Sequence, residues 1–175
     1  MSELFLGHPF IAPVIELARQ AGEAILPYWR AEVAVTSKAD DSPVTAADLA
    51  AHHLILAGLT ALDPSIPVLS EEDADIDQSV RAGWQRWWLV DPLDGTKEFI
   101  SGSEEFTVNI ALIEQGRVVF GVVSIPTTGR CYFGGAGLGG LAFGRQCRAQ
   151  ADSSAPGQGC GRSLYRGGQP SSYQP

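Results

Sequence analysis

The sequence lacks any apolar run that approaches the roughly 20 residues a membrane-spanning helix needs. Its first residues, M-S-E-L-F-L-G-H-P-F, also lack the basic start and the long apolar stretch of a secretory signal. With 175 residues, the chain has about the length of one domain and is long enough to bury a core. These features predict a soluble, cytoplasmic protein and leave peripheral contact with the inner face of the membrane open.

Cysteine and positive charge are both scarce. The spacings of Cys131, Cys147 and Cys160 fit neither a disulfide framework nor a C-x-x-C metal site, so we expect unpaired thiols. The net charge of -8 argues against nucleic acid and anionic membranes as general partners. Because residues 135–175 carry four Arg and one acid, the acidic excess lies in residues 1–134. An acidic body that handles an anionic substrate needs a cation between them.

Valine and isoleucine are absent from the last 41 residues, which contain ten Gly, five Gln and five Ser. Such a segment has too little apolar content to pack, which predicts disorder, and a coding sequence read in the wrong frame would have the same composition. We therefore divide the chain into an α+β portion at 1–139 and a low-complexity tail at 140–175 that is disordered or non-native.

Apolar periodicity predicts two helices and several strands. The first helix spans 11–31, with a kink at Pro27, and the second spans 46–61. Thr45 caps the second helix, and Asp48 completes a capping-box arrangement. The predicted strands are 66–69, 86–90, 106–114, 117–125 and 130–133, the third and fourth forming a hairpin. The strand at 86–90 is apolar enough to be buried on both faces. Together these elements predict a helical layer on a sheet, either α/β or α+β.

Acidic residues lie where predicted strands end or a helix begins: Asp48, Glu71, Asp91 and Asp94. Mg2+ prefers oxygen ligands and keeps some waters, so one or two carboxylates per ion suffice. Asp91 and Asp94, separated by a Pro-Leu turn, can point into one crevice, with the Leu93 carbonyl as a further ligand. Gly95 and Thr96 then offer backbone N–H groups at the start of a short helix, where a phosphate can bind. This layout is typical of metal-assisted phosphate chemistry.

Each of these features also has a simpler interpretation. D-P-L-D-G-T alone fits a turn with an N-capping Asp, and Glu71 opens the acidic stretch E-E-D-A-D-I-D, which fits a solvated loop. Asp48 fits simple helix capping. We interpret His8, His52 and His53 as core or surface histidines rather than as ligands.

Four segments, in order, resemble the lithium-sensitive, magnesium-dependent phosphatases that include inositol monophosphatase and fructose-1,6-bisphosphatase. They are K-A-D-D-S-P-V-T-A-A-D at 38–48, V-L-S-E-E-D at 68–73, V-D-P-L-D-G-T at 90–96 and E-F-T-V-N-I-A-L-I at 105–113. The form D-G-T-K-E-F resembles the 3'(2'),5'-bisphosphate nucleotidase branch of that family. The resemblance covers about residues 10–139 and implies the N-terminal half of the family's layered sandwich.

The resemblance implies a metal-binding role for four residues. Glu71, Asp91 and the Leu93 carbonyl would hold one Mg2+, and Asp91 and Asp94 would hold a second. Glu71 would help to hold a third, more weakly bound ion, and Li+ is the expected inhibitor. These residues make 1–139 the metal-binding phosphatase portion of the chain.

The resemblance also implies catalytic and substrate-binding roles. Thr96 with Asp48 would orient and deprotonate the attacking water, while the amides of Gly95 and Thr96 would bind the phosphate being removed. Lys97 would help to hold the anion. The implied substrate-binding set is Glu71, Leu93, Asp94, Gly95, Thr96 and Lys97.

The family's second half has no counterpart in this sequence. That half supplies a W-D-x-A-type motif and much of the nucleotide pocket, yet no Trp follows Trp88 and the only acid after Glu114 is Asp152. We expect the segment from about Gly140 to be a frameshifted or truncated ending, with an unpaired strand edge near Phe133.

The function implied by the resemblance is removal of the 3'-phosphate of 3'-phosphoadenosine 5'-phosphate, giving AMP and phosphate in sulfate assimilation, with activity impaired in this chain. The alternatives are an inositol-monophosphatase-like enzyme and an inactive, metal-binding fragment. The expected partner is a small phosphorylated nucleotide and not a nucleic acid, and the sequence does not fix the oligomeric state.

Overall fold

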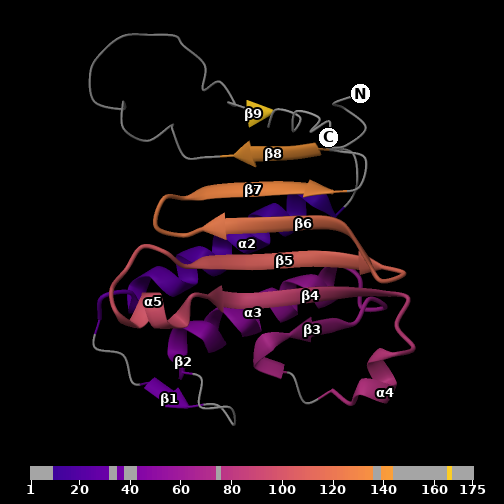
Figure 1. The fold of residues 1–175 in the computed structure, drawn as a ribbon, viewed down its shortest axis with the longest axis horizontal. Coiled ribbons are helices and arrows are strands. Elements are labelled where there is room, and N and C mark those ends of the chain that lie inside the picture. The colour runs from indigo at the N-terminus through magenta and orange to yellow at the C-terminus, as the bar shows by residue number, and fades with distance from the viewer. Residues whose placement is uncertain are drawn as a thin grey trace, which may run out of the picture.

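The computed structural model describes residues 10–31, 35–37, 43–73, 76–135, 139–143 and 165–166. Its main feature is a seven-stranded sheet in the order β3-β4-β5-β6-β7-β8-β9 (Figure 1). Strands β3 and β4 run parallel, and every other neighbouring pair is antiparallel. The strands are β3 (Val68–Ser70), β4 (Arg86–Asp94), β5 (Thr107–Glu114), β6 (Arg117–Ile125), β7 (Arg130–Gly135), β8 (Gly139–Phe143) and β9 (Tyr165–Arg166). A separate pair joins β1 (Val35–Ser37) to β2 (Pro43–Thr45).

Two long helices, α2 (Ile11–Ile25) and α3 (Ala46–Leu62), lie together on one face of the sheet (Figure 1). Their apolar sides and the facing strand residues form one buried core that contains Val14, Ile25, Ile55, Leu59, Trp88, Ile110 and Val122. Short elements complete the described chain: η1 (Leu26–Tyr28), η2 (Glu71–Asp73), α4 (Gln78–Arg81) and α5 (Thr96–Ile100). The predicted helical layer on a sheet is confirmed. Among the helices that the structure describes, none combines the length and the hydropathy that a membrane crossing would require.

The helix boundaries follow local sequence signals. The α-helix α2 ends at Ile25, earlier than the predicted residue 31, because Pro27 lies in a 3-10 turn and Trp29 is extended. Helix α3 begins with the predicted capping box, in which the Thr45 hydroxyl accepts from an early helix amide and Asp48 accepts from the Thr45 amide.

Strand β4 differs from its prediction in two ways. It continues through Pro92 to Asp94, and a register irregularity between Asp91 and Asp94 replaces the predicted Pro-Leu turn. A bulge of this kind accommodates a proline that cannot donate to the ladder. The prediction that β4 is buried on both faces is also wrong, since Leu89 is 43% exposed. Helices α2 and α3 cover only the opposite face of the sheet (Figure 1).

The β5–β6 hairpin is confirmed, and its turn residues Gln115 and Gly116 both have positive φ, as a type I' turn requires. The prediction of an unpaired edge near Phe133 is wrong, because Phe133 on β7 pairs with Leu141 on β8. Strand β8 crosses the predicted boundary after residue 139. Most of the predicted tail, together with His8, Cys147 and Cys160, lies outside the described residues.

Candidate functional site

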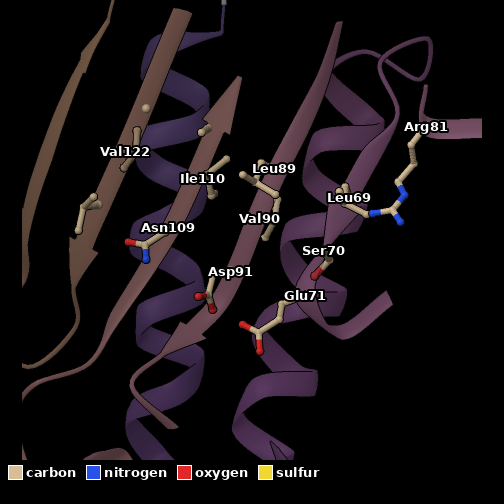
Figure 2. Close-up of a pocket in the computed structure, with 13 residues that line it drawn as sticks. Leu69, Ser70, Glu71, Arg81, Leu89, Val90, Asp91, Asn109, Ile110 and Val122 are labelled. Atoms are coloured by element: carbon tan, nitrogen blue, oxygen red, sulfur yellow. The ribbon is translucent and has the colours of Figure 1, made fainter. Parts of the chain in front are cut away.

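The ends of β3 and β4 bring two of the predicted carboxylates together. Ser70 and Val90 are paired in the parallel register, so Glu71 and Asp91, the next residues along each strand, lie side by side (Figure 2). Glu71 is exposed at the start of η2, whereas Asp91 is half-buried, and a hydrogen bond links their carboxyl groups. The parallel pairing therefore produces an acidic pair from two segments that are 20 residues apart in sequence.

The environment of Asp91 disfavours its negative charge. Burial, followed by the charges of Glu71 and Asp94, raises the pKa of Asp91 to about 7. Its Oδ1 atom is buried and has no hydrogen-bond partner among the described residues. A buried carboxylate oxygen that lacks a partner among the described residues, with the charges of two further acids nearby, offers the oxygen ligands that a hard cation such as Mg2+ prefers.

Asp94 lies at the end of β4 and has its own partner. Its Oδ2 accepts a hydrogen bond of 3.0 Å from Asn109 Nδ2, and Asn109 on β5 faces Asp91 in the strand register. The Leu93 carbonyl accepts from the Thr96 hydroxyl at 3.2 Å. Within the residues that the structure describes, no three His, Cys, Asp or Glu side chains form a ready-made metal-binding cluster.

A second pair joins helix α3 to the residues after β4. The Thr96 hydroxyl lies 3.2 Å from Asp48 Oδ1, and Asp48 is fully buried. The other carboxylate oxygen, Oδ2, accepts from the Thr45 amide at 2.8 Å and from the Thr45 hydroxyl. Both predicted catalytic side chains are therefore in contact, although they are 48 residues apart.

The turn after β4 requires glycine on two grounds. Gly95 has a φ of 92°, in the left-handed region, and a Cβ at this position would lie 2.7 Å from the Glu105 carbonyl oxygen. This close approach fixes the start of α5, where Thr96 is half-buried and Lys97 is exposed.

Sequence reasoning missed two polar groups beside the site. Asn109 is the only side-chain amide in the segment E-F-T-V-N-I-A-L-I and lies between the apolar residues Val108 and Ile110, and this contrast could have drawn attention to it. The second group is the buried pair of His52 Nδ1 and Ser70 Oγ, which lie 2.9 Å apart. Burial, aided by the neighbouring His53, lowers the pKa of His52, while the charge of Asp73 opposes that shift.

An apolar hollow of about 540 Å3 adjoins the acidic pair on the face of the sheet that α2 and α3 do not cover (Figure 2). Its lining runs from Glu71, Asp91 and Asn109 at one end to aliphatic side chains such as Leu69, Leu89 and Val123. Arg81 from α4 contributes the cationic side chain of the lining.

A mixed sheet with a helical layer, an acidic pair at neighbouring strand ends and a partly buried Thr–Asp contact defines a layered α/β protein with a carboxylate site. The chain belongs to the inositol monophosphatase family, whose model matches residues 7–167. That match extends further than the residues 10–139 over which the resemblance was predicted.

The relatives within this family include bisphosphate nucleotidases. The chain is 57% identical over 126 residues to the 3'(2'),5'-bisphosphate nucleotidase CysQ of Salmonella typhimurium, a match that covers 71% of this chain and 51% of that protein. It is 55% identical over 136 residues to the CysQ protein of Escherichia coli K12, covering 77% of this chain and 54% of that protein. The chain thus spans about half the length of the curated relatives it matches.

Two solved structures share the fold of this chain over about half of their own length. CysQ from Bacteroides thetaiotaomicron superposes with a TM-score of 0.64 at 43% identity, covering 76% of this chain and 48% of that one. The IMPase of Thermotoga maritima superposes with a TM-score of 0.65 at 27% identity, covering 85% of this chain and 53% of that one.

Proposed function

We propose that this chain is the metal-binding portion of a Mg2+-dependent phosphomonoester hydrolase that removes the 3'-phosphate of 3'-phosphoadenosine 5'-phosphate, giving AMP and phosphate. The observation that carries the proposal is the acidic pair Glu71–Asp91 beside the Thr96–Asp48 contact, in a chain 55–57% identical to CysQ nucleotidases. The similar TM-scores to CysQ and IMPase structures do not separate the two substrates, whereas the sequence identity favours the nucleotide.

The metal ligands are proposed from the donors at the strand ends. Glu71, Asp91 and the Leu93 carbonyl would hold one Mg2+, Asp91 and Asp94 would hold a second, and Glu71 would contribute to a third. When bound, such ions would lower the pKa of water and neutralise phosphate charge. We also expect Li+ to inhibit. The raised pKa of Asp91 and its unpartnered oxygen support this assignment, because a cation would relieve both.

The Thr96–Asp48 pair is proposed to act on the attacking water. The attacking water would give a proton to Thr96 Oγ while the hydroxyl proton of Thr96 moves to Asp48 Oδ1, which already lies 3.2 Å away. Asp48 is held in place by the Thr45 amide, so its orientation does not depend on substrate. The Gly95 and Thr96 amides and Lys97 bind the phosphate at the start of α5.

Phosphate release by the purified 175-residue chain tests the proposal. With Mg2+ present, 3'-phosphoadenosine 5'-phosphate should be hydrolysed in preference to inositol monophosphate, and Asp91→Asn should remove the activity. Preference for inositol monophosphate would favour the other branch of the family. Divalent-ion binding without any turnover would identify the chain as a metal-binding fragment, and release that survives Asp91→Asn would place the activity elsewhere.

A further inference from the structure

Helix α3 presents two buried polar side chains on the face that packs against the sheet. Asp48 and His52 lie one turn apart and are 0% and 8% exposed. The same face carries the apolar residues Ala47, Ala51, Ile55 and Leu59. Because burial of a polar group is costly unless the group is hydrogen-bonded, the partners of these two side chains matter.

The two polar groups contact residues at the ends of β3 and just after β4. Asp48 accepts from Thr96, just beyond β4, while His52 Nδ1 lies 2.9 Å from the hydroxyl of Ser70, the last residue of β3. Ser70 is 3% exposed and directly precedes Glu71. Thus one helix face is hydrogen-bonded to the last residue of β3, which directly precedes Glu71, and to the first residue of α5, which lies two residues after the end of β4.

A hydrogen bond constrains position more narrowly than an apolar contact does, because it weakens steeply with angle and distance. The His52–Ser70 bond therefore restricts the rotation of the Ser70 side chain. It also restricts the distance between the end of β3 and helix α3. Because Glu71 is the next residue after Ser70, the position of its backbone is restricted as well. Without the bond, a buried hydroxyl and a buried imidazole would each lack this partner, and the strand end could shift to reach others.

We propose that His52 and Ser70 are a positioning pair that fixes Glu71 for divalent-cation binding. This inference rests on the proposed function, because it assigns the pair to the same metal site. The pair does not contact the ion. It acts by keeping Glu71 at the distance from Asp91 that the parallel register of β3 and β4 sets.

The test compares two serines in the same sheet. Ser70→Ala removes the contact with His52. Ser124→Ala removes a comparable buried contact between Ser124 on β6 and Cys131 on β7. Ser124 is 2% exposed, so both changes delete a buried hydroxyl, but only one lies beside the site. Isothermal titration with Mn2+ should show about 10- to 100-fold weaker binding for Ser70→Ala and little change for Ser124→Ala.

Substitution of the other partner provides a second, independent test. His52→Leu should weaken Mn2+ binding as much as Ser70→Ala, and the double variant should be no worse than either, because both remove one interaction. His52→Asn, which keeps a polar atom near the Nδ1 position, should recover part of the affinity. Urea unfolding of each variant establishes that the chain is folded in the titration.

The possible failures are distinguishable. If the unsubstituted chain binds no Mn2+, the proposed function is wrong and this inference with it. If the unsubstituted chain binds Mn2+, Asp91→Asn abolishes that binding and Ser70→Ala matches Ser124→Ala, only the positioning role is overturned. Additive losses from Ser70→Ala and His52→Leu would also overturn it, since independent effects exclude a shared contact.

Discussion

Asp48 and Asp91 are both withdrawn from solvent, yet their carboxylates receive very different numbers of hydrogen-bond donors. Asp48 is fully buried and accepts from the Thr45 amide, the Thr45 hydroxyl and the Thr96 hydroxyl. Asp91 has a buried oxygen without a hydrogen-bond partner in the described part of the chain, and the charges of Glu71 and Asp94 help burial to raise its pKa to about 7.

In the folded chain the carboxylate of Asp48 is fully hydrogen-bonded, whereas the carboxylate of Asp91 is partly buried beside other negative charges. Such crowding of like charges costs stability and is characteristic of functional sites. Removing the charge should therefore affect the two positions in opposite ways: loss of stability at Asp48 and gain of stability at Asp91, with loss of activity at both.

Asp91→Asn should have the largest effect on activity. Because Asp91 is the ligand shared by two proposed ions, phosphate release should fall by about 10^3-fold or more. At pH 8 and without divalent cations, the same variant should be more stable than the unsubstituted chain, because a crowded charge is removed. Assays of phosphate release and of urea unfolding on the same variant measure the expected loss of activity and gain of stability. An Asp91→Asn variant that is less stable than the unsubstituted chain would contradict the contrast drawn between Asp91 and Asp48.

Asp48→Asn should lower activity and stability together. Loss of the proton acceptor for Thr96 should cost about 10^2- to 10^4-fold in turnover. Loss of the capping box should lower the free energy of unfolding by about 0.5–2 kcal/mol. Asp77→Asn is the matched control, since Asp77 caps α4 and lies outside the proposed machinery. Activity in Asp48→Asn equal to that of this control would exclude a catalytic role for Asp48.

The pH dependence of stability should reveal the pKa of Asp91, which is raised from 3.8 to about 7. Between these values the folded chain keeps a proton at Asp91 that the unfolded chain has released. The contribution of Asp91 to the free energy of unfolding therefore falls as pH rises from about 4 to about 7, and is constant above and below that window. Urea titrations in the presence of a chelator measure the free energy of unfolding at pH 5 and at pH 8. The decrease from pH 5 to pH 8 should be larger for the unsubstituted chain than for Asp91→Asn. Parallel profiles would contradict the shift.

Asn109→Ala should produce the smallest change. It removes the 3.0 Å contact with Asp94 at an exposed position, so the free energy of unfolding should change by less than about 1 kcal/mol. Mn2+ affinity should fall by about 10-fold, because Asn109 orients a proposed ligand. Titration calorimetry measures this loss, and unchanged affinity would show that Asp94 needs no orientation.

Local signals in the sequence predicted several elements correctly. The spacing of Thr45 and Asp48 predicted the capping box, and the turn at Gln115-Gly116 predicted the hairpin. Residue type at strand ends, with the ordered motifs, indicated Glu71 and Asp91. These features depend on bonds or patterns spanning only a few residues, which is why they can be predicted without the fold.

Other features could not be predicted, because they depend on which elements become neighbours. The exposure of Leu89 follows from helices covering one face of the sheet only, and the pairing of Phe133 follows from the addition of β8. The His52–Ser70 contact joins a helix to a strand, so neither residue was distinguishable from an ordinary core or loop residue.

The sequence by itself determined the residue types at the site, the cap of α3 and the hairpin, since each rests on short-range geometry or on an ordered motif. The family resemblance already paired Asp48 with Thr96 and Glu71 with Asp91, but only the tertiary structure showed the contacts that join them and the burial and charges that raise the pKa of Asp91. The physical reason is that burial and the proximity of charges depend on which residues are neighbours in space. For Glu71 and Asp91, the parallel pairing of β3 with β4 determines those neighbours.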